Sequence, residues 1–172
     1  MRRTKSTARV LVAAWITGLC LVAGSAGAVG SGDPAPAFSA RSLTGPNTLT
    51  LAEHRGKVVY LDFWASWCGP CLVSLPALEE LRGEFPGEQF QILAVNLDED
   101  PSKARAFLER NPVGYPSAHD PKGQVPGRYG LETMPTSYLI DRKGVVRYVH
   151  EGFRKGDVDE LRAQIRAALE ER

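Results

Sequence analysis

The sequence predicts a single α/β domain with a mixed central sheet flanked by helices. Two observations lead to this prediction. Apolar runs typical of buried strands alternate with helical segments early in the chain, which implies a parallel core. Two later strand-like runs are joined by the short turn "DRKG", which adds antiparallel strands. A chain of 172 residues has room for one domain of ordinary size.

The charge of the chain is unevenly distributed. Its net charge is +1, which offers no basic surface for nucleic acid. Residues 1–28 hold four basic residues and no acid; without those four, 17 basic and 20 acidic residues remain, a net charge of −3. Hydrophobic residues make up 43% of the chain, enough for a packed core. We therefore expect a folded domain behind a basic leader.

Residues 1–28 are typical of an export segment. The basic stretch "MRRTKSTAR" precedes an apolar run over 10–23, and "AGA" at 26–28 offers a signal-peptide cleavage site after Ala28. The alternative is an uncleaved N-terminal membrane anchor, because residues 10–29 are uncharged and about 20 residues can span a bilayer. In both cases the rest of the chain is exported. We expect it in the periplasm or at the outer face of the cytoplasmic membrane.

The next part of the chain predicts a linker, a hairpin and a strand–helix pair. Residues 29–37 are rich in Gly, Pro and Ala, as linkers are. Residues 38–51 alternate around Gly-Pro-Asn, which predicts a short β-hairpin. The apolar run over 57–64 is typical of a strand buried on both faces. Leucines at helical spacing predict a helix over 68–85, which Pro76 should kink.

The middle of the chain predicts a second strand–helix pair and an added segment. Residues 89–97 form a second buried strand, and a helix over 100–111 opens with an Asp-Pro capping pattern. A short extended piece at 115–120 and a broken helical turn at 123–131 follow.

The end of the chain predicts a hairpin and a final helix. The strands 136–140 and 145–149 flank the "DRKG" turn. Apolar side chains on one face predict a helix over 157–172, and Asp157 with Glu160 can form a capping box at its start.

Cys68 and Cys71 are the only cysteines beyond the export segment, and such a pair has three interpretations. A zinc site needs four ligands, whereas His54, His119 and His150 are widely scattered. A structural disulfide across so short a loop would add little stability. The third interpretation, a dithiol that exchanges electrons, fits a Cys-x-x-Cys motif between a strand and a helix.

The chemistry of such a dithiol assigns different roles to the two thiols. Cys68 falls in the first turn of the predicted helix, where free N–H groups and the helix dipole favour a thiolate. Cys71 lies one turn later, is more buried, and can resolve the mixed disulfide. Pro70 suits the first turn because its missing N–H is no loss there. We expect Cys68 as an exposed nucleophile that forms the redox-active disulfide with Cys71.

Asp62 stands alone among apolar neighbours in "VVYLDFW". A buried ionised carboxylate is costly, so the pKa of this carboxyl should be raised. The alternative is an aspartate at the strand end that faces water.

Three segments carry a family resemblance. "DFWASWCGPC" resembles the thioredoxin active-site segment, Pro76 matches the kinking proline of that family, and "TMPTSYLID" resembles its cis-proline loop at Pro135. The N-terminal hairpin and the added segment around 98–125 resemble the exported TlpA-like subgroup, which includes ResA-like and cytochrome c maturation thioredoxins. The resemblance runs over 33–170 and implies a thioredoxin-like fold over 38–172, with an N-terminal β-hairpin extension and a central βα insertion.

The resemblance also implies roles for residues around the dithiol. Asp62 would accept the proton of Cys71, with Ala94 at the position where thioredoxins often carry a Lys. Pro135 would be cis, keep metals off the dithiol and expose the Met134 backbone to a client peptide. Substrate contacts are expected at Trp67, Gly69, Pro70 and Met134. Trp64 is expected in the core.

Two positions depart from the cytochrome-maturation and ResA-like relatives. Ser74 and Thr136 stand where those relatives often carry Glu, which favours a general reductant over a protein dedicated to apocytochrome c. His150 is interpreted as a surface residue.

Three functions from different classes follow. The first is a thiol–disulfide oxidoreductase outside the cytoplasm. The Gly-Pro bridge between its cysteines is that of thioredoxin, whose reduction potential is about −270 mV. We therefore expect a reductant of client protein disulfides. It would act as a monomer without cofactor or metal, and a membrane electron donor of the DsbD/CcdA type would recharge it. The second is a peroxidase, although Ala65 replaces the Thr expected three residues before Cys68. The third is a copper(I)-delivery or assembly module.

Overall fold

The computed structural model describes residues 27–171 of the chain. The expected leader, residues 1–28, therefore lies almost entirely outside the described residues. From residue 27 to residue 171, none of the helices is both long and apolar enough to cross a membrane.

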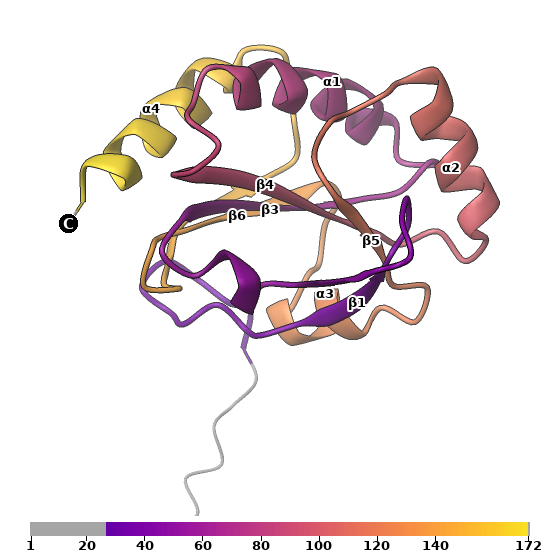
Figure 1. The fold of residues 1–172 in the computed structure, drawn as a ribbon, viewed down its shortest axis with the longest axis horizontal. Coiled ribbons are helices and arrows are strands. Elements are labelled where there is room, and N and C mark those ends of the chain that lie inside the picture. The colour runs from indigo at the N-terminus through magenta and orange to yellow at the C-terminus, as the bar shows by residue number, and fades with distance from the viewer. Residues whose placement is uncertain (1–26, 172) are drawn as a thin grey trace, which may run out of the picture.

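A seven-stranded mixed sheet forms the centre of the fold (Figure 1), with the strand order β2-β1-β5-β4-β3-β6-β7. The strands are β1 (Ser39–Ser42), β2 (Thr48–Thr50), β3 (Val58–Trp64), β4 (Phe90–Asn96), β5 (Ser117–His119), β6 (Thr136–Ile140) and β7 (Val146–Glu151). Strands β3, β4 and β5 run parallel to one another, whereas the β1–β2, β1–β5, β3–β6 and β6–β7 pairs are antiparallel. The expected mixed sheet with an N-terminal hairpin is confirmed.

Helices cover both faces of this sheet. The α-helices of the described residues are α1 (Gly69–Gly83), α2 (Pro101–Arg110), α3 (Gln124–Tyr129) and α4 (Asp157–Glu170), and a 3-10 turn, η1 (Ala52–His54), follows β2. Helices α1, α2 and α4 lie over one face, and α3 lies against the other (Figure 1). Two cores result, because successive residues of a strand point to opposite faces. Tyr60 and Trp64 of β3 enter the core under α1, whereas Leu61 and Phe63 enter the core on the α3 side.

Two helices begin as the sequence predicts. Cys68 is the N-cap of α1, and Pro70 lies in its first turn. Asp100 caps α2, because its carboxylate accepts a hydrogen bond from the Ser102 N–H at 2.9 Å, and Pro101 is the first helical residue.

The capping box predicted at the start of α4 is wrong. Gly156 is the N-cap, and no side chain caps this end. The Asp157 carboxylate instead turns back, where it accepts the Arg154 N–H at 2.7 Å and contacts His150 Nε2 at 3.2 Å. Glu160 accepts a hydrogen bond from the Tyr148 hydroxyl at 2.8 Å. Tertiary partners on β7 and the following loop therefore outcompete the local cap.

Residues 29–37, expected as a linker, lie hydrogen-bonded along the domain. Val29 donates its N–H to the Tyr129 carbonyl at 3.0 Å, and Gly32 donates to the Val146 carbonyl at 2.7 Å. Pro34 forms an isolated antiparallel bridge with Val145. Their backbone groups thus find partners at the end of α3 and at the start of β7.

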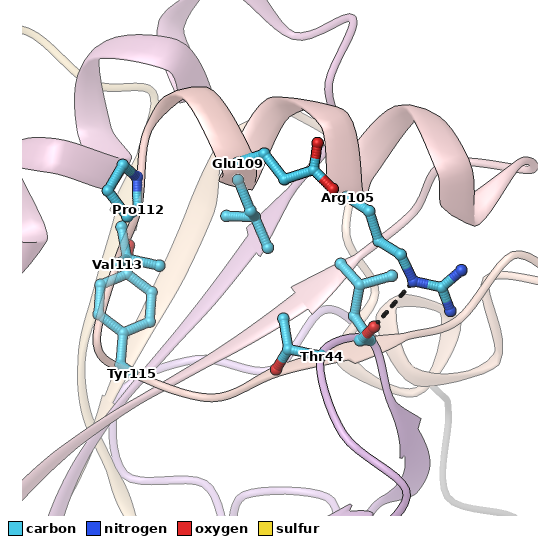
Figure 2. A pocket seen from close by; sticks show the side chains of 8 residues that line it. Thr44, Arg105, Glu109, Pro112, Val113 and Tyr115 are labelled. Atoms are coloured by element: carbon cyan, nitrogen blue, oxygen red, sulfur yellow. Dashed lines mark hydrogen bonds between the residues drawn. The ribbon is translucent and has the colours of Figure 1, made fainter.

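A pocket of about 340 Å³ opens between α2, the loop that follows it and the β1–β2 turn. Figure 2 shows Arg105 reaching across from α2, where its Nε donates to the Leu43 carbonyl at 3.1 Å. Leu108, Pro112 and Tyr115 are among its apolar lining residues. The pocket contains none of the residues expected at the redox site.

Candidate functional site

Cys68 and Cys71 meet at the N-terminus of α1. They form a disulfide with an S–S distance of 2.04 Å and a Cα–Cα distance of 5.3 Å. The Cys71 N–H points at the Cys68 Sγ across 3.3 Å. In the reduced protein, this N–H and the helix dipole would stabilise negative charge on Cys68, since the first turn of a helix leaves its N–H groups without backbone partners.

Cys68 is less open than the sequence suggests. It was expected to be exposed, yet it is 5% accessible, and Cys71 is 0% accessible. The reason is the disulfide itself, because the Cys68 sulfur is bonded to a residue in the core under α1. Cys68 is nevertheless the outer of the two, and the preceding Trp67 is 67% exposed. A partner sulfur therefore has an approach only to the Cys68 side of the bond.

The loop before β6 carries the expected proline. The Met134–Pro135 peptide bond is cis, and the Pro135 carbonyl accepts the Gly152 N–H at 2.7 Å. Beside Pro70, a groove of about 400 Å³ is lined by the segment from His150 to Arg154 and by Asp157. The space next to the Cys-x-x-Cys turn is thus large enough to receive part of a partner chain.

Asp62 is completely buried in the middle of the sheet, so the alternative of an aspartate facing water is wrong. Ser137 on the neighbouring strand β6 donates its hydroxyl to Asp62 Oδ1 at 2.6 Å. Burial raises the pKa of the Asp62 carboxyl from 3.8 to about 7, and the Ser137 hydrogen bond acts against this rise. The carboxyl can therefore gain or lose a proton near neutral pH.

Tyr60 lies two residues before Asp62 on the same face of β3 and is also buried. Its hydroxyl has no hydrogen-bond partner among the described residues, and neither has Asp62 Oδ2. Burial and the negative charge of Asp62 raise the pKa of the Tyr60 hydroxyl well above 10, and the Ser137 hydroxyl acts against this rise. Tyr60 therefore stays protonated at any pH at which Asp62 titrates.

A second buried aspartate holds the loop that leads from β3 to Cys68. The Asp98 carboxylate accepts the Ser66 N–H at 2.9 Å, the Ser66 hydroxyl at 2.7 Å and the Asn96 amide at 2.7 Å. Trp64, expected in the core, is 0% accessible, and its indole N–H donates to Ser117 Oγ at 3.0 Å. These bonds fix the backbone that positions the first cysteine.

His150 is buried, whereas the sequence suggested a surface residue. It is 7% accessible, its Nε2 lies 3.2 Å from Asp157 Oδ2, and its ring stacks on Tyr148. Phe153 also packs against this ring, in an edge-on arrangement. The loop between β7 and α4 folds over the imidazole, which a single-strand pattern does not reveal.

Sequence reasoning missed several of these partners. Ser137 was not selected, because only the pairing of β3 with β6 shows that it shares a face with Asp62. Tyr60 could have been found, since it lies two residues before Asp62 in the same predicted strand and alternation places both side chains on one face. Asp98 could have been found, since an aspartate two residues after the end of a buried parallel strand lies near the carboxyl edge of the sheet. No comparable signal in the sequence marks His150.

Comparisons with known proteins agree with this geometry. The sequence model of the Redoxin family matches residues 30–165. The chain is 37% identical over 125 residues to the thiol-disulfide oxidoreductase ResA of Geobacillus thermodenitrificans, which covers 73% of this chain and 71% of that protein. It is 36% identical over 124 residues to the thioredoxin-like protein YneN of Bacillus subtilis, which covers 70% and 71%.

A solved structure has a similar fold over most of its length. The structure assigned to the thiol:disulfide interchange protein DsbE of Chlorobium tepidum superimposes with a TM-score of 0.78 at 46% sequence identity. The match covers 83% of this chain and 99% of that one.

Proposed function

We propose that this chain, which belongs to the Redoxin family and is a thiol–disulfide oxidoreductase, works outside the cytoplasm as a reductant of protein disulfides. The observation that carries the proposal is the Cys68–Cys71 disulfide at the start of α1, which follows the exposed Trp67 and encloses Pro70, a residue that lines a groove. The names of its relatives, thiol-disulfide oxidoreductase and thiol:disulfide interchange protein, support protein disulfides as substrates.

The first chemical step belongs to Cys68. In the reduced protein its thiolate attacks one sulfur of a client disulfide, so that a Cys68–client bond forms, the client S–S bond breaks and one client thiolate leaves. We assign contacts with the client to residues next to Cys68 in the chain and to the loop before β6, namely Trp67, Gly69, Pro70 and the Met134 backbone.

The second step belongs to Cys71. Its thiol loses a proton to Asp62 and attacks Cys68 Sγ, which forms the Cys68–Cys71 disulfide and releases the second client thiolate. Two electrons have then moved to the client. Asp62 can serve as the acceptor because its carboxyl has a pKa of about 7. The oxidised protein regains two electrons and two protons from a dithiol donor, for which we propose a membrane protein of the DsbD/CcdA type.

A trapping experiment tests the proposed function. Cys71→Ser removes the resolving thiol, so the Cys68–client disulfide should persist and be recovered from cells as mixed disulfides that a reducing agent releases. Cys68→Ser is the matched control and should capture nothing. With purified protein, the unmodified chain should reduce insulin, and both variants should lose at least about 100-fold of this activity.

Three results would contradict the proposal. The first is an equal yield of mixed disulfides from the two variants, since Cys68 would then not be the attacking thiol. The second is a reduction potential above about −150 mV, which would make the protein an oxidant rather than a reductant. The third is rapid consumption of hydrogen peroxide without insulin reduction, which would favour the peroxidase.

A further inference from the structure

We propose that Ser137 is a positioning residue of the redox site, whose hydroxyl holds the Asp62 carboxylate and favours its charged, proton-accepting form. This inference rests on the proposed function, in which Asp62 accepts the proton of Cys71. Strand β6, which follows the Pro135 loop, would then also supply the residue that holds the proton acceptor.

The geometry of the sheet brings the two side chains together. Asp62 and Ser137 are directly opposite each other in the antiparallel pair of β3 and β6, so their side chains leave the sheet on the same face. The Ser137 hydroxyl donates to Asp62 Oδ1 at 2.6 Å, a short distance typical of a hydrogen bond to a charged acceptor. Both residues are buried, which shields this bond from competing solvent.

No other described side chain or backbone group shares this task. Asp62 Oδ2 is buried without a hydrogen-bond partner among residues 27–171. Two buried tyrosines face the charge of Asp62: the Tyr60 hydroxyl, which is also influenced by the Ser137 hydroxyl, and the Tyr115 hydroxyl, which donates to the Leu75 carbonyl at 3.0 Å. Neither donates a hydrogen bond to Asp62. On the other flank, β4 places Ala94 opposite Asp62, and its methyl group offers no donor. The Ser137 hydroxyl is thus the one hydrogen-bond donor to this carboxylate within the described part of the chain.

The direction of the effect follows from the donor. A hydroxyl that donates to a carboxylate stabilises the ionised form more than the protonated one. The pKa of Asp62 is already raised by burial, and the Ser137 bond is the influence that lowers it. Loss of the hydroxyl should therefore raise the pKa of Asp62 further and leave less of the proton acceptor at neutral pH.

The test compares three variants of Ser137 in the full domain. Ser137→Ala removes the hydroxyl, whereas Ser137→Thr retains it, and Ser137→Val has the shape of the threonine without the hydroxyl. The Asp62 side-chain carboxyl signal is followed by NMR from pH 5 to pH 10. We expect the midpoint to rise by about one pH unit in the Ala and Val variants and to remain near the original value in the Thr variant.

Activity should follow the same titration. A rise of about one pH unit from a pKa of about 7 lowers the ionised fraction of Asp62 at pH 7 roughly fivefold. Insulin reduction at pH 7 should fall by about that factor in the Ala and Val variants and recover at pH 9. In an Asp62→Asn background, the same Ser137 substitutions should leave the pH profile unchanged.

Ser117→Ala is the matched control. Ser117 lies in the same cross-strand row, beyond Ala94, and its hydroxyl accepts the Trp64 indole N–H rather than contacting Asp62. This variant removes a buried serine hydroxyl, so it should lower stability without moving the Asp62 midpoint. Circular dichroism establishes that each variant is folded, and the Thr–Val pair supplies the comparison if the Ala variant does not fold.

Two outcomes would overturn the inference. One is an identical Asp62 midpoint in the Val and Thr variants, and the other is a shift in Ser117→Ala as large as in Ser137→Ala. Either can occur in a protein that reduces insulin normally. If instead the unmodified protein fails to reduce insulin while the midpoint shifts as expected, the proposed function fails and the contact between Ser137 and Asp62 stands.

Discussion

At the scale of single residues, the buried Asp62 carboxyl couples folding to pH. In the unfolded chain it loses its proton near pH 3.8, whereas in the folded protein it keeps the proton up to about pH 7. Between these values the folded state binds more protons, so the free energy of unfolding falls as the pH rises. Over roughly three pH units the loss is on the order of 4 kcal/mol, complete above pH 7.

Asp62→Asn should therefore raise stability and lower activity at the same time. At pH 8 we expect its free energy of unfolding to exceed that of the original protein by about 2–4 kcal/mol, and at pH 4 the two should agree within about 1 kcal/mol. Insulin reduction near pH 7 should fall at least about tenfold, because Cys71 loses its proton acceptor.

Urea unfolding of the oxidised proteins at the two pH values measures the first effect. An equal stability gain at pH 4 and pH 8 would assign it to packing instead of charge. If Asp62→Asn and the original protein have the same thiol–disulfide exchange rates between pH 6 and pH 9, Asp62 is excluded as the proton acceptor.

At the scale of elements, the end of α3 shows how residues 27–36 lie along the domain. Gly130 follows α3 with a φ of 65°, a conformation that favours glycine. A Cβ at this position would lie 2.6 Å from the Ala28 Cα, closer than atoms can approach. Glycine is therefore required twice, by the backbone turn and by the chain that crosses it.

Gly130→Ala should lower the free energy of unfolding by about 2–3 kcal/mol in a protein that contains Ala28. In a protein that begins at Val29, only the cost of the positive φ remains, about 1 kcal/mol. Gly127→Ala is the control, because Gly127 lies inside α3 and a Cβ there would have no atom within 4 Å. This substitution should stabilise the helix by about 0.5–1 kcal/mol. Equal losses in both glycine variants would contradict this account.

Most elements could be predicted from the sequence, because their signals are local. The buried strand at 57–64 and the Asp-Pro start of α2 were both predicted, and both are observed. The start of α4 could not be predicted, because the carboxylates of Asp157 and Glu160 can accept hydrogen bonds either from the helix N-terminus or from β7 and the β7–α4 loop. That choice depends on contacts between segments, which no local pattern encodes.

At the scale of the whole molecule, the charge distribution bears on where the protein works. The basic residues of 1–28 precede an apolar run, and the remaining chain has a net charge of −3. A reducing dithiol in an oxidising compartment must be recharged by an outside donor, which makes location part of the function.

The full chain fused to alkaline phosphatase, which is active only outside the cytoplasm, should show enzyme activity in cells. The same fusion without residues 1–28 is the control and should be inactive. N-terminal sequencing then separates the two forms of the leader, with Val29 as the first residue after cleavage. Equal phosphatase activity with and without residues 1–28 would refute export by this segment.

The amino-acid sequence alone was enough to predict the α/β class, the Cys-x-x-Cys pair at a helix start and the isolated acid in a buried strand. These features depend on neighbours in the chain, which periodicity and residue type reveal. The packed fold was needed to show that Ser137 lies opposite Asp62 and that His150 is covered. Each of these depends on strand register or on loops folding over the sheet, and such long-range contacts arise only when the whole chain packs.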